Sequence, residues 1–87
     1  MSVTVELTYE MSKALGARRL EFEQAATVAD AVREARERFG EAGADFETLT
    51  RVAAVAVNGV LVNHRRGMKT RLADGDVVAF VKAAAGG

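Results

Sequence analysis

The last two residues of the sequence, Gly86 and Gly87, are the ones whose type and position most clearly indicate chemistry. Glycine has no Cβ and adopts backbone angles that other residues avoid, so a glycine pair can pass through a narrow channel in another protein. Two terminal glycines arise by chance in roughly 0.5% of chains, given a glycine frequency of about 7%. We therefore predict that the carboxylate of Gly87 is the reacting group, and that Ala85 and Gly86 contact the protein that takes it up.

Two other groups of polar residues have simpler interpretations. Asp74 and Asp76 flank Gly75 between apolar segments, which is more typical of a turn than of a metal site or an acid/base pair. The loop from residue 63 to residue 71 is basic, and two interpretations stay open: a solvated loop, or a site for a phosphate or an acidic partner surface. Its charged residues are His64, Arg65, Arg66, Lys69 and Arg71.

The composition argues against several classes of function. Among 87 residues, 12 Lys and Arg balance 12 Asp and Glu, so no net charge attracts nucleic acid or anionic membranes. The sequence has no cysteine for a disulfide or a thiolate site, and the lone His64 cannot form a histidine cluster. We expect no cofactor or metal bound by this chain, and neither a nucleic-acid nor a membrane partner. No signal-peptide pattern or apolar run of membrane-spanning length occurs, which predicts a cytoplasmic protein.

Hydrophobic periodicity predicts two strands and one helix in the first half of the chain. Apolar and polar residues alternate over Val3–Tyr9 and again over Arg19–Glu23, which predicts a hairpin with a loose loop at Met11–Arg18. Thr27 is placed to cap a helix and Gly40 to end it. The apolar stripe of this helix comprises Val28, Ala31, Val32, Ala35 and Phe39.

The second half of the chain is predicted to add three strands. Residues Glu41–Thr50 are expected to form a connection with one helical turn, in which Phe46 and Leu49 make a satellite hydrophobic cluster. Asn58-Gly59 predicts a tight hairpin turn because both residues tolerate positive φ. The predicted strands are Val52–Val57, covered on both faces or central in a sheet, Val60–Val62 and Val77–Val81.

This order of elements predicts an α+β fold. With two strands, one helix and three strands, the helix must cross one face of a single sheet to bury its apolar stripe. That is the ubiquitin-like β-grasp arrangement, a mixed sheet of four or five strands with one main helix across one face. We expect residues 1–81 to form this domain and residues 82–87 to form a flexible C-terminal tail.

The last predicted strand is apolar on both faces, which indicates a partner. If Val78 and Phe80 face the core, then Val77, Ala79 and Val81 face the side that a one-helix domain leaves uncovered. Leu61 in the neighbouring strand extends this apolar patch. Such patches mark interaction surfaces, so we predict that Leu61, Ala79 and Val81 bind a partner. The alternative is that the loop from residue 63 to residue 71 covers them.

The chain resembles the MoaD/ThiS family of ubiquitin-like sulfur carrier proteins. The resembling segments are the first strand, the helix start Thr27-Val28-Ala29-Asp30-Ala31, the turn Ala56-Val57-Asn58-Gly59, the segment from Leu72 to Val78, and the terminal Gly86-Gly87. They span nearly the whole chain. Family members often carry Phe-Pro-Pro or Leu-Pro-Pro before the end, where this chain has Phe80-Val81-Lys82-Ala83-Ala84, so the subfamily and its acceptor enzyme stay open.

The resemblance implies a cycle run by partner enzymes. A ubiquitin-activating-type enzyme resembling MoeB or ThiF would use ATP and magnesium to adenylate the Gly87 carboxylate, and a persulfide sulfur donor would then replace AMP to give a thiocarboxylate. The sulfur would be delivered to a sulfur-accepting synthase, which in the molybdopterin branch is the MoaE-like large subunit. The chain itself would be a carrier and not an enzyme.

Two alternatives remain beside the sulfur carrier. In the first, activated Gly87 is joined to lysines of target proteins, as in ubiquitin-like protein modification. In the second, the chain is a non-covalent binding module whose terminal glycines are incidental. The intact mass of the protein separates the sulfur carrier from the protein modifier. The carrier predicts an exchange of oxygen for sulfur, and the modifier predicts larger conjugates.

Overall fold

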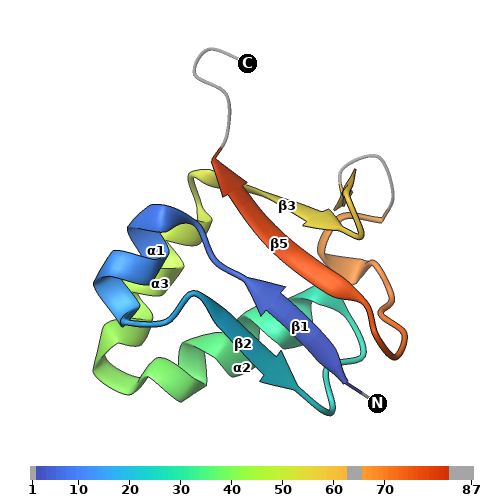
Figure 1. Cartoon of the computed structure of the whole chain (residues 1–87), viewed down its shortest axis with the longest axis horizontal. Coiled ribbons are helices and arrows are strands. Elements are labelled where there is room, and N and C mark those ends of the chain that lie inside the picture. The colour runs from blue at the N-terminus through green and yellow to red at the C-terminus, as the bar shows by residue number, and fades with distance from the viewer. Residues whose placement is uncertain (1, 63–65, 83–87) are drawn as a thin grey trace.

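A five-stranded mixed sheet forms the centre of the computed structural model, which describes residues 2–62 and 66–82 (Figure 1). The strand order is β2-β1-β5-β3-β4, with β5 in the middle. β1 pairs with β5 in parallel, whereas the other neighbours pair antiparallel. The strands are β1 (Val3–Glu6), β2 (Arg19–Phe22), β3 (Ala53–Val57), β4 (Val60–Leu61) and β5 (Val77–Lys82). The predicted α+β, β-grasp architecture is therefore confirmed.

The helices lie together on one face of this sheet and leave the other face open (Figure 1). α2 is the longest helix and crosses the sheet, while α3 packs against α2 and α1 packs against α3 near one end. The core lies between the helices and the sheet. The α-helices are α1 (Tyr9–Leu15), α2 (Val28–Phe39) and α3 (Gly43–Thr50), and the short 3-10 helices are η1 (Gly40–Ala42) and η3 (Gly67–Lys69).

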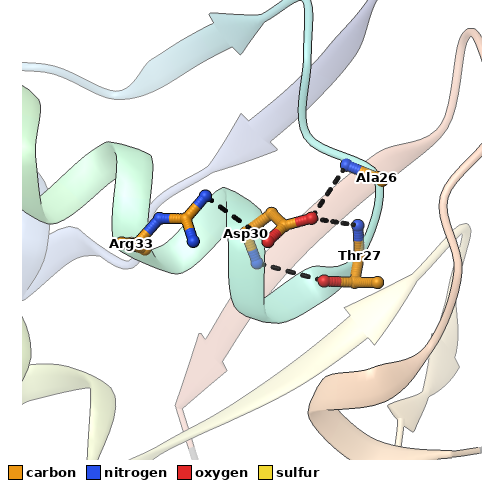
Figure 2. A network of polar contacts seen from close by, with 4 residues as sticks. All are labelled: Ala26, Thr27, Asp30 and Arg33. Carbon is orange, nitrogen blue, oxygen red and sulfur yellow. Dashed lines mark hydrogen bonds and ion pairs between the residues drawn. The ribbon is translucent and has the colours of Figure 1, made fainter.

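α2 begins at the predicted cap, Thr27, which forms a capping box with Asp30. The Thr27 hydroxyl accepts a hydrogen bond from the Asp30 amide at 3.2 Å, and the Asp30 carboxylate accepts from the amides of Thr27 and Ala26, both at 3.2 Å (Figure 2). Arg33 lies 3.5 Å from the other oxygen of the same carboxylate. These bonds satisfy amide groups that have no partner inside the helix, which fixes where α2 starts.

The predicted loose loop between the first two strands is wrong, because that segment contains α1. β1 ends at Glu6, and Tyr9 is 71% exposed instead of facing the core. The Thr8 hydroxyl accepts a hydrogen bond from the Met11 amide at 3.1 Å and caps the helix, which ends at Gly16 with φ 72°. Burial of Met11, with no exposed surface, ties α1 to the core.

The prediction of a satellite cluster at Phe46 is also wrong, because Phe46 is at the centre of the core. The segment folds as η1 and α3, and the Phe46 side chain is fully buried. Its ring centroid lies 5.7 Å from that of Phe39 and 5.6 Å from that of Phe80. Gly43 permits this packing, because a Cβ there would lie 2.6 Å from the carbonyl oxygen of Arg36.

The two turns predicted at Asn58-Gly59 and around Gly75 are both present. Asn58 and Gly59 have φ of 50° and 85°, as a two-residue hairpin turn requires. The Asp74 carboxylate accepts a hydrogen bond from the Ser2 amide at 2.6 Å. Asp76 accepts from the Ala73 amide at 2.8 Å and from the Asn58 side-chain amide at 2.9 Å. These contacts give both aspartates the structural role that the sequence predicts.

Replacement of Phe46 by alanine should lower the free energy of unfolding by about 3–5 kcal/mol, since it removes the ring that joins α2, α3 and β5. Chemical denaturation followed by circular dichroism measures this loss. Replacement of the 68% exposed Val52 by alanine is the matched control, and it should change stability by less than about 0.5 kcal/mol. A loss at Phe46 as small as that at Val52 would contradict the central position of this ring.

Candidate functional site

The side chains of β5 alternate between the core and the open face of the sheet. Val78 and Phe80 are buried, with 0% and 4% of their surface exposed. Val77 and Ala79 are half-buried and Val81 is 40% exposed. The predicted direction of each side chain is therefore confirmed, and β5 presents apolar residues on both of its faces.

The apolar patch on the open face crosses three strands. The strand register places Ala79 opposite Ala56 and Ala56 opposite Leu61, so these three residues form one row across the sheet. Ala56 is only 7% exposed, yet it does not belong to the core cluster, which agrees with its position on the outer face. Leu61 is half-buried and lines a hollow that Met68 of η3 also lines. Val81 is not among the residues of that hollow and remains 40% exposed.

A charged pair marks the other border of the patch. In the same row, Glu6 lies beside Ala79 and Arg19 lies beside Glu6. The Arg19 guanidinium is 3.3 Å from the Glu6 carboxylate, and both side chains are exposed. The open face is therefore apolar around β5, β3 and β4 and polar over β1 and β2, which is the usual arrangement of an apolar docking area with a charged rim.

β5 ends near Val52, an exposed apolar residue that the sequence analysis placed in a strand. β5 runs through Lys82, one residue beyond the predicted end, and Lys82 pairs with Ala53. β3 begins at Ala53, so Val52 lies before the strand and is 68% exposed. A hollow of about 300 Å³ here is lined by Thr8, Glu10, Leu49, Val52, Ala53 and Lys82. Val52 and Val81 are thus two exposed apolar residues near the end of β5, and we refer to them together as the apolar collar.

The remaining predicted site residues are divided between the described and undescribed parts of the chain. Ala85, Gly86 and Gly87 lie outside the described residues, as do His64 and Arg65 of the basic loop. The structure brings the other three basic residues of that loop, Arg66, Lys69 and Arg71, around one hollow near η3. Among the described residues, no group of three or more His, Cys, Asp or Glu could hold a metal ion. No helix in the described part is long and apolar enough to cross a membrane.

A family model, that of the ThiS family, matches residues 5–87, which include the terminal glycine pair as well as every strand except the start of β1. The chain belongs to the ThiS family. Members of this family are small carrier proteins that act with partner enzymes. No curated protein sequence matches the chain.

Solved structures of similar fold come from archaea and bacteria. The small archaeal modifier protein 1 of Methanosarcina acetivorans superposes with a TM-score of 0.80 at 18% identity, over 99% of this chain and 96% of its own. A chain of the BexX/CysO complex of Amycolatopsis orientalis gives 0.75 at 23% identity, over 98% and 99%. A chain of the complex of subunits 1 and 2 of the Helicobacter pylori molybdopterin-converting factor gives 0.65 at 21% identity, over the full length of both. At these identities the likeness shows the β-grasp fold.

Two substitutions on adjacent residues of β5 should separate the surface from the core. Phe80→Ala should cost about 3–5 kcal/mol of unfolding free energy, because it empties a buried site beside Phe46. Val81→Asp should cost less than about 1 kcal/mol, the range of strand propensities, because its side chain reaches solvent. Thermal and urea unfolding of both variants measures this contrast. A collapse of stability in Val81→Asp would show that Val81 belongs to the core.

Proposed function

We propose that this protein is a sulfur carrier whose Gly87 carboxylate is adenylated by a partner enzyme and converted to a thiocarboxylate. The thiocarboxylate then supplies sulfur in the biosynthesis of a cofactor or metabolite, in the manner of a molybdopterin synthase small subunit. The observation that carries the proposal is the family match over residues 5–87, which joins the β-grasp domain and the Gly86-Gly87 pair in one unit. The apolar collar of Val52 and Val81, at the point where β5 leads toward that pair, supports it.

Adenylation solves the chemical problem that a carboxylate is a poor electrophile. One oxygen of the Gly87 carboxylate attacks the α-phosphorus of ATP, pyrophosphate leaves, and a mixed anhydride with AMP is formed. Repulsion between the carboxylate and the triphosphate must be offset by cations and magnesium, which the partner supplies. Glycine suits this step because it has no side chain to obstruct the approach of its own carboxylate.

Sulfur then replaces the activated oxygen. The terminal sulfur of a persulfide donor attacks the acyl carbon and AMP leaves with the shared electron pair. A second thiol next attacks the donor-side sulfur of the acyl persulfide, so a disulfide forms and the thiocarboxylate is released. The thiocarboxylate sulfur is a good nucleophile, and the accepting synthase uses it on its own substrate. All catalytic groups belong to the partners.

The length of chain between β5 and Gly87 determines which surface must touch a partner. Residues 83–87 can span at most about 18 Å, since an extended residue covers at most ~3.6 Å. If the Gly87 carboxylate enters an active site below a partner's surface, Lys82 must approach that surface closely. Val81 precedes Lys82 in β5, and Val52 precedes Ala53, which pairs with Lys82, so these two exposed residues lie where such a partner would make contact. Ala79 lies further along the same face of β5.

Protein modification is the second candidate function. The observation that favours it is the fold similarity to a protein named as a small archaeal modifier, at a TM-score of 0.80. It would use the same adenylated Gly87, with a lysine amine of a target protein as the nucleophile in place of sulfur. The same domain and the same terminal carboxylate serve both reactions, so the products distinguish them.

The proposal predicts that incubation with ATP, magnesium and an activating enzyme resembling MoeB or ThiF yields the AMP-linked protein. Addition of a persulfide donor should then increase the intact mass by the difference between sulfur and oxygen. The matched control is the same chain with one residue appended after Gly87, which should give neither product. Larger conjugates without the sulfur-for-oxygen exchange in protein purified from cells would favour the modifier. Wild-type protein that remains unmodified with every such enzyme would contradict both functions.

Val81→Asp should weaken the same reaction at the binding step. A carboxylate placed in the apolar collar must be desolvated when the partner covers it, so KM for the carrier should rise by about tenfold or more. Because Gly87 is unchanged, kcat should stay within about twofold. Glu41→Asp, on the exposed surface of η1, is the control and should leave both constants unchanged. An unchanged KM for Val81→Asp would exclude Val81 from the partner contact.

A further inference from the structure

A second surface of the domain concentrates positive charge without using the tail. Arg66, Lys69 and Arg71 line a hollow of about 820 Å³ together with Thr70, and no carboxylate of a described residue lines it. The three charged side chains are exposed. Among the described residues, they take part in no ion pair. Their charges are therefore available to an external anionic group.

The backbone that carries these cations is firmly attached to the domain. Thr70 is only 3% exposed, and its hydroxyl donates a hydrogen bond of 2.6 Å to the Gly67 carbonyl. The Val28 amide donates to the Thr70 carbonyl at 3.1 Å, and the Leu72 amide donates to the Ala26 carbonyl at 2.9 Å. These bonds hold the segment against the start of α2, so the backbone positions of the three basic residues are fixed relative to the rest of the molecule.

The start of α2 adds to the positive potential at this place. The N-terminal end of a helix carries a partial positive charge. Thr27, the cap of α2, forms an isolated antiparallel β-bridge with Arg71 through the backbone. The nearby carboxylate of Asp30 opposes this potential, but it is engaged by the amides of the cap and by Arg33 (Figure 2). Within the described part of the chain, the hollow therefore combines three cations that make no ion pair with a helix start whose capping carboxylate is paired with Arg33.

Negative charge is gathered elsewhere on the same domain. A hollow of about 710 Å³ between β2 and α2 is lined by Glu21, Glu23, Glu34 and Glu37, and Arg38 is the only Lys or Arg among the described residues that line it. The guanidinium of Arg38 stacks 4.5 Å from the centre of the Phe22 ring. A net charge of zero thus conceals two regions of opposite sign, and such a molecule is oriented by the field of a charged partner even though it is not attracted overall.

The chemistry of the basic hollow fits an acidic protein surface. The cations are long, exposed side chains around an open hollow, an arrangement suited to a broad surface, whereas a small phosphate is usually held by converging backbone amides. A neutral protein lacks the broad positive field on which binding to nucleic acid depends. Carboxylates spread over a protein surface can pair with several exposed cations at once, and charge pairs of this kind govern association rates and orientation.

We infer that the basic hollow of Arg66, Lys69 and Arg71 docks onto a carboxylate-rich surface of the enzyme that activates Gly87. This inference rests on the proposed function. The site that receives the Gly87 carboxylate and ATP must itself be rich in cations and metal, so an acidic surface at a distance from it would repel the tail and attract the hollow. η3 lies well away from the end of β5 (Figure 1), so the two contacts together would fix the orientation of the carrier.

The first test measures adenylation of the full chain by the activating enzyme that accepts the wild-type protein. The variant Arg66→Gln/Lys69→Gln/Arg71→Gln should lower kcat/KM by about tenfold at low salt, because electrostatic steering is lost. The deficit should shrink as salt increases, and kcat at saturation should stay within about twofold. Thr70 is kept, so the fold of the segment is preserved, and thermal unfolding checks this.

The matched control removes the same charges elsewhere. Lys13→Gln/Arg18→Gln/Arg38→Gln also loses one lysine and two arginines from exposed positions, and its kcat/KM should stay within about twofold of wild type. Equal losses in both variants, or no loss in the first, would overturn the inference while leaving the proposed function intact. Failure of the wild-type chain to be adenylated would instead count against the proposed function.

A second measurement decides the inference without any activating enzyme. A hexaglutamate peptide added to the labelled full chain should shift the amide resonances of residues 66–71, and the shifts should disappear in the Arg66→Gln/Lys69→Gln/Arg71→Gln variant. Inorganic phosphate and vesicles of phosphatidylcholine with phosphatidylglycerol are the competing probes. Stronger effects from either probe than from the peptide, or peptide shifts located outside residues 66–71, would overturn an acidic protein surface as the occupant.

Discussion

The structure depends on the position of β5 at the centre of the sheet. It is parallel to β1 and antiparallel to β3, so it has a strand on each side and must be apolar toward the helices. Phe80 meets this requirement by packing edge-on against Phe46, which joins the sheet to α3 and through Phe39 to α2. Because side chains alternate along a strand, the same geometry turns Val81 outward beside the point where β5 ends. The core and the proposed partner surface are therefore two faces of one strand.

Elements encoded by local signals were predictable from the sequence, and elements that depend on tertiary packing were not. α2 has a strong capping box and an apolar stripe, and the Asn58-Gly59 turn requires residues that tolerate positive φ. α1 was missed because the alternation of β1 continues by coincidence to Tyr9, although Thr8 and Gly16 carry the start and stop signals of a helix. α3 has few apolar residues, and its position follows from the close approach that Gly43 allows.

The candidate site followed the same division. The direction of each β5 side chain was predictable, because a one-residue error would have placed Phe80 in solvent. The exposure of Val52 was not, since an unbroken apolar run does not reveal where pairing starts, and only the Ala53–Lys82 pair sets that limit. The gathering of Arg66, Lys69 and Arg71 around one hollow depends on the bonds between residues 26–28 and 70–72. Such contacts between distant segments leave no periodic pattern in a sequence.

The separation of charge on this neutral domain has a physical consequence for a carrier that must meet more than one partner. A protein that offers its end to successive enzymes has to bind each one and then leave, so its contacts must be specific without being tight. An apolar collar of two valines supplies little area, and a larger one would expose the carrier to aggregation. Charge contacts away from the tail orient the carrier without greatly lengthening its residence time on the partner, because exposed charges act chiefly on the rate of encounter. If the basic hollow docks as inferred, the separation of charge between it and the acidic hollow of β2 and α2 adds selectivity to the contact made by the apolar collar.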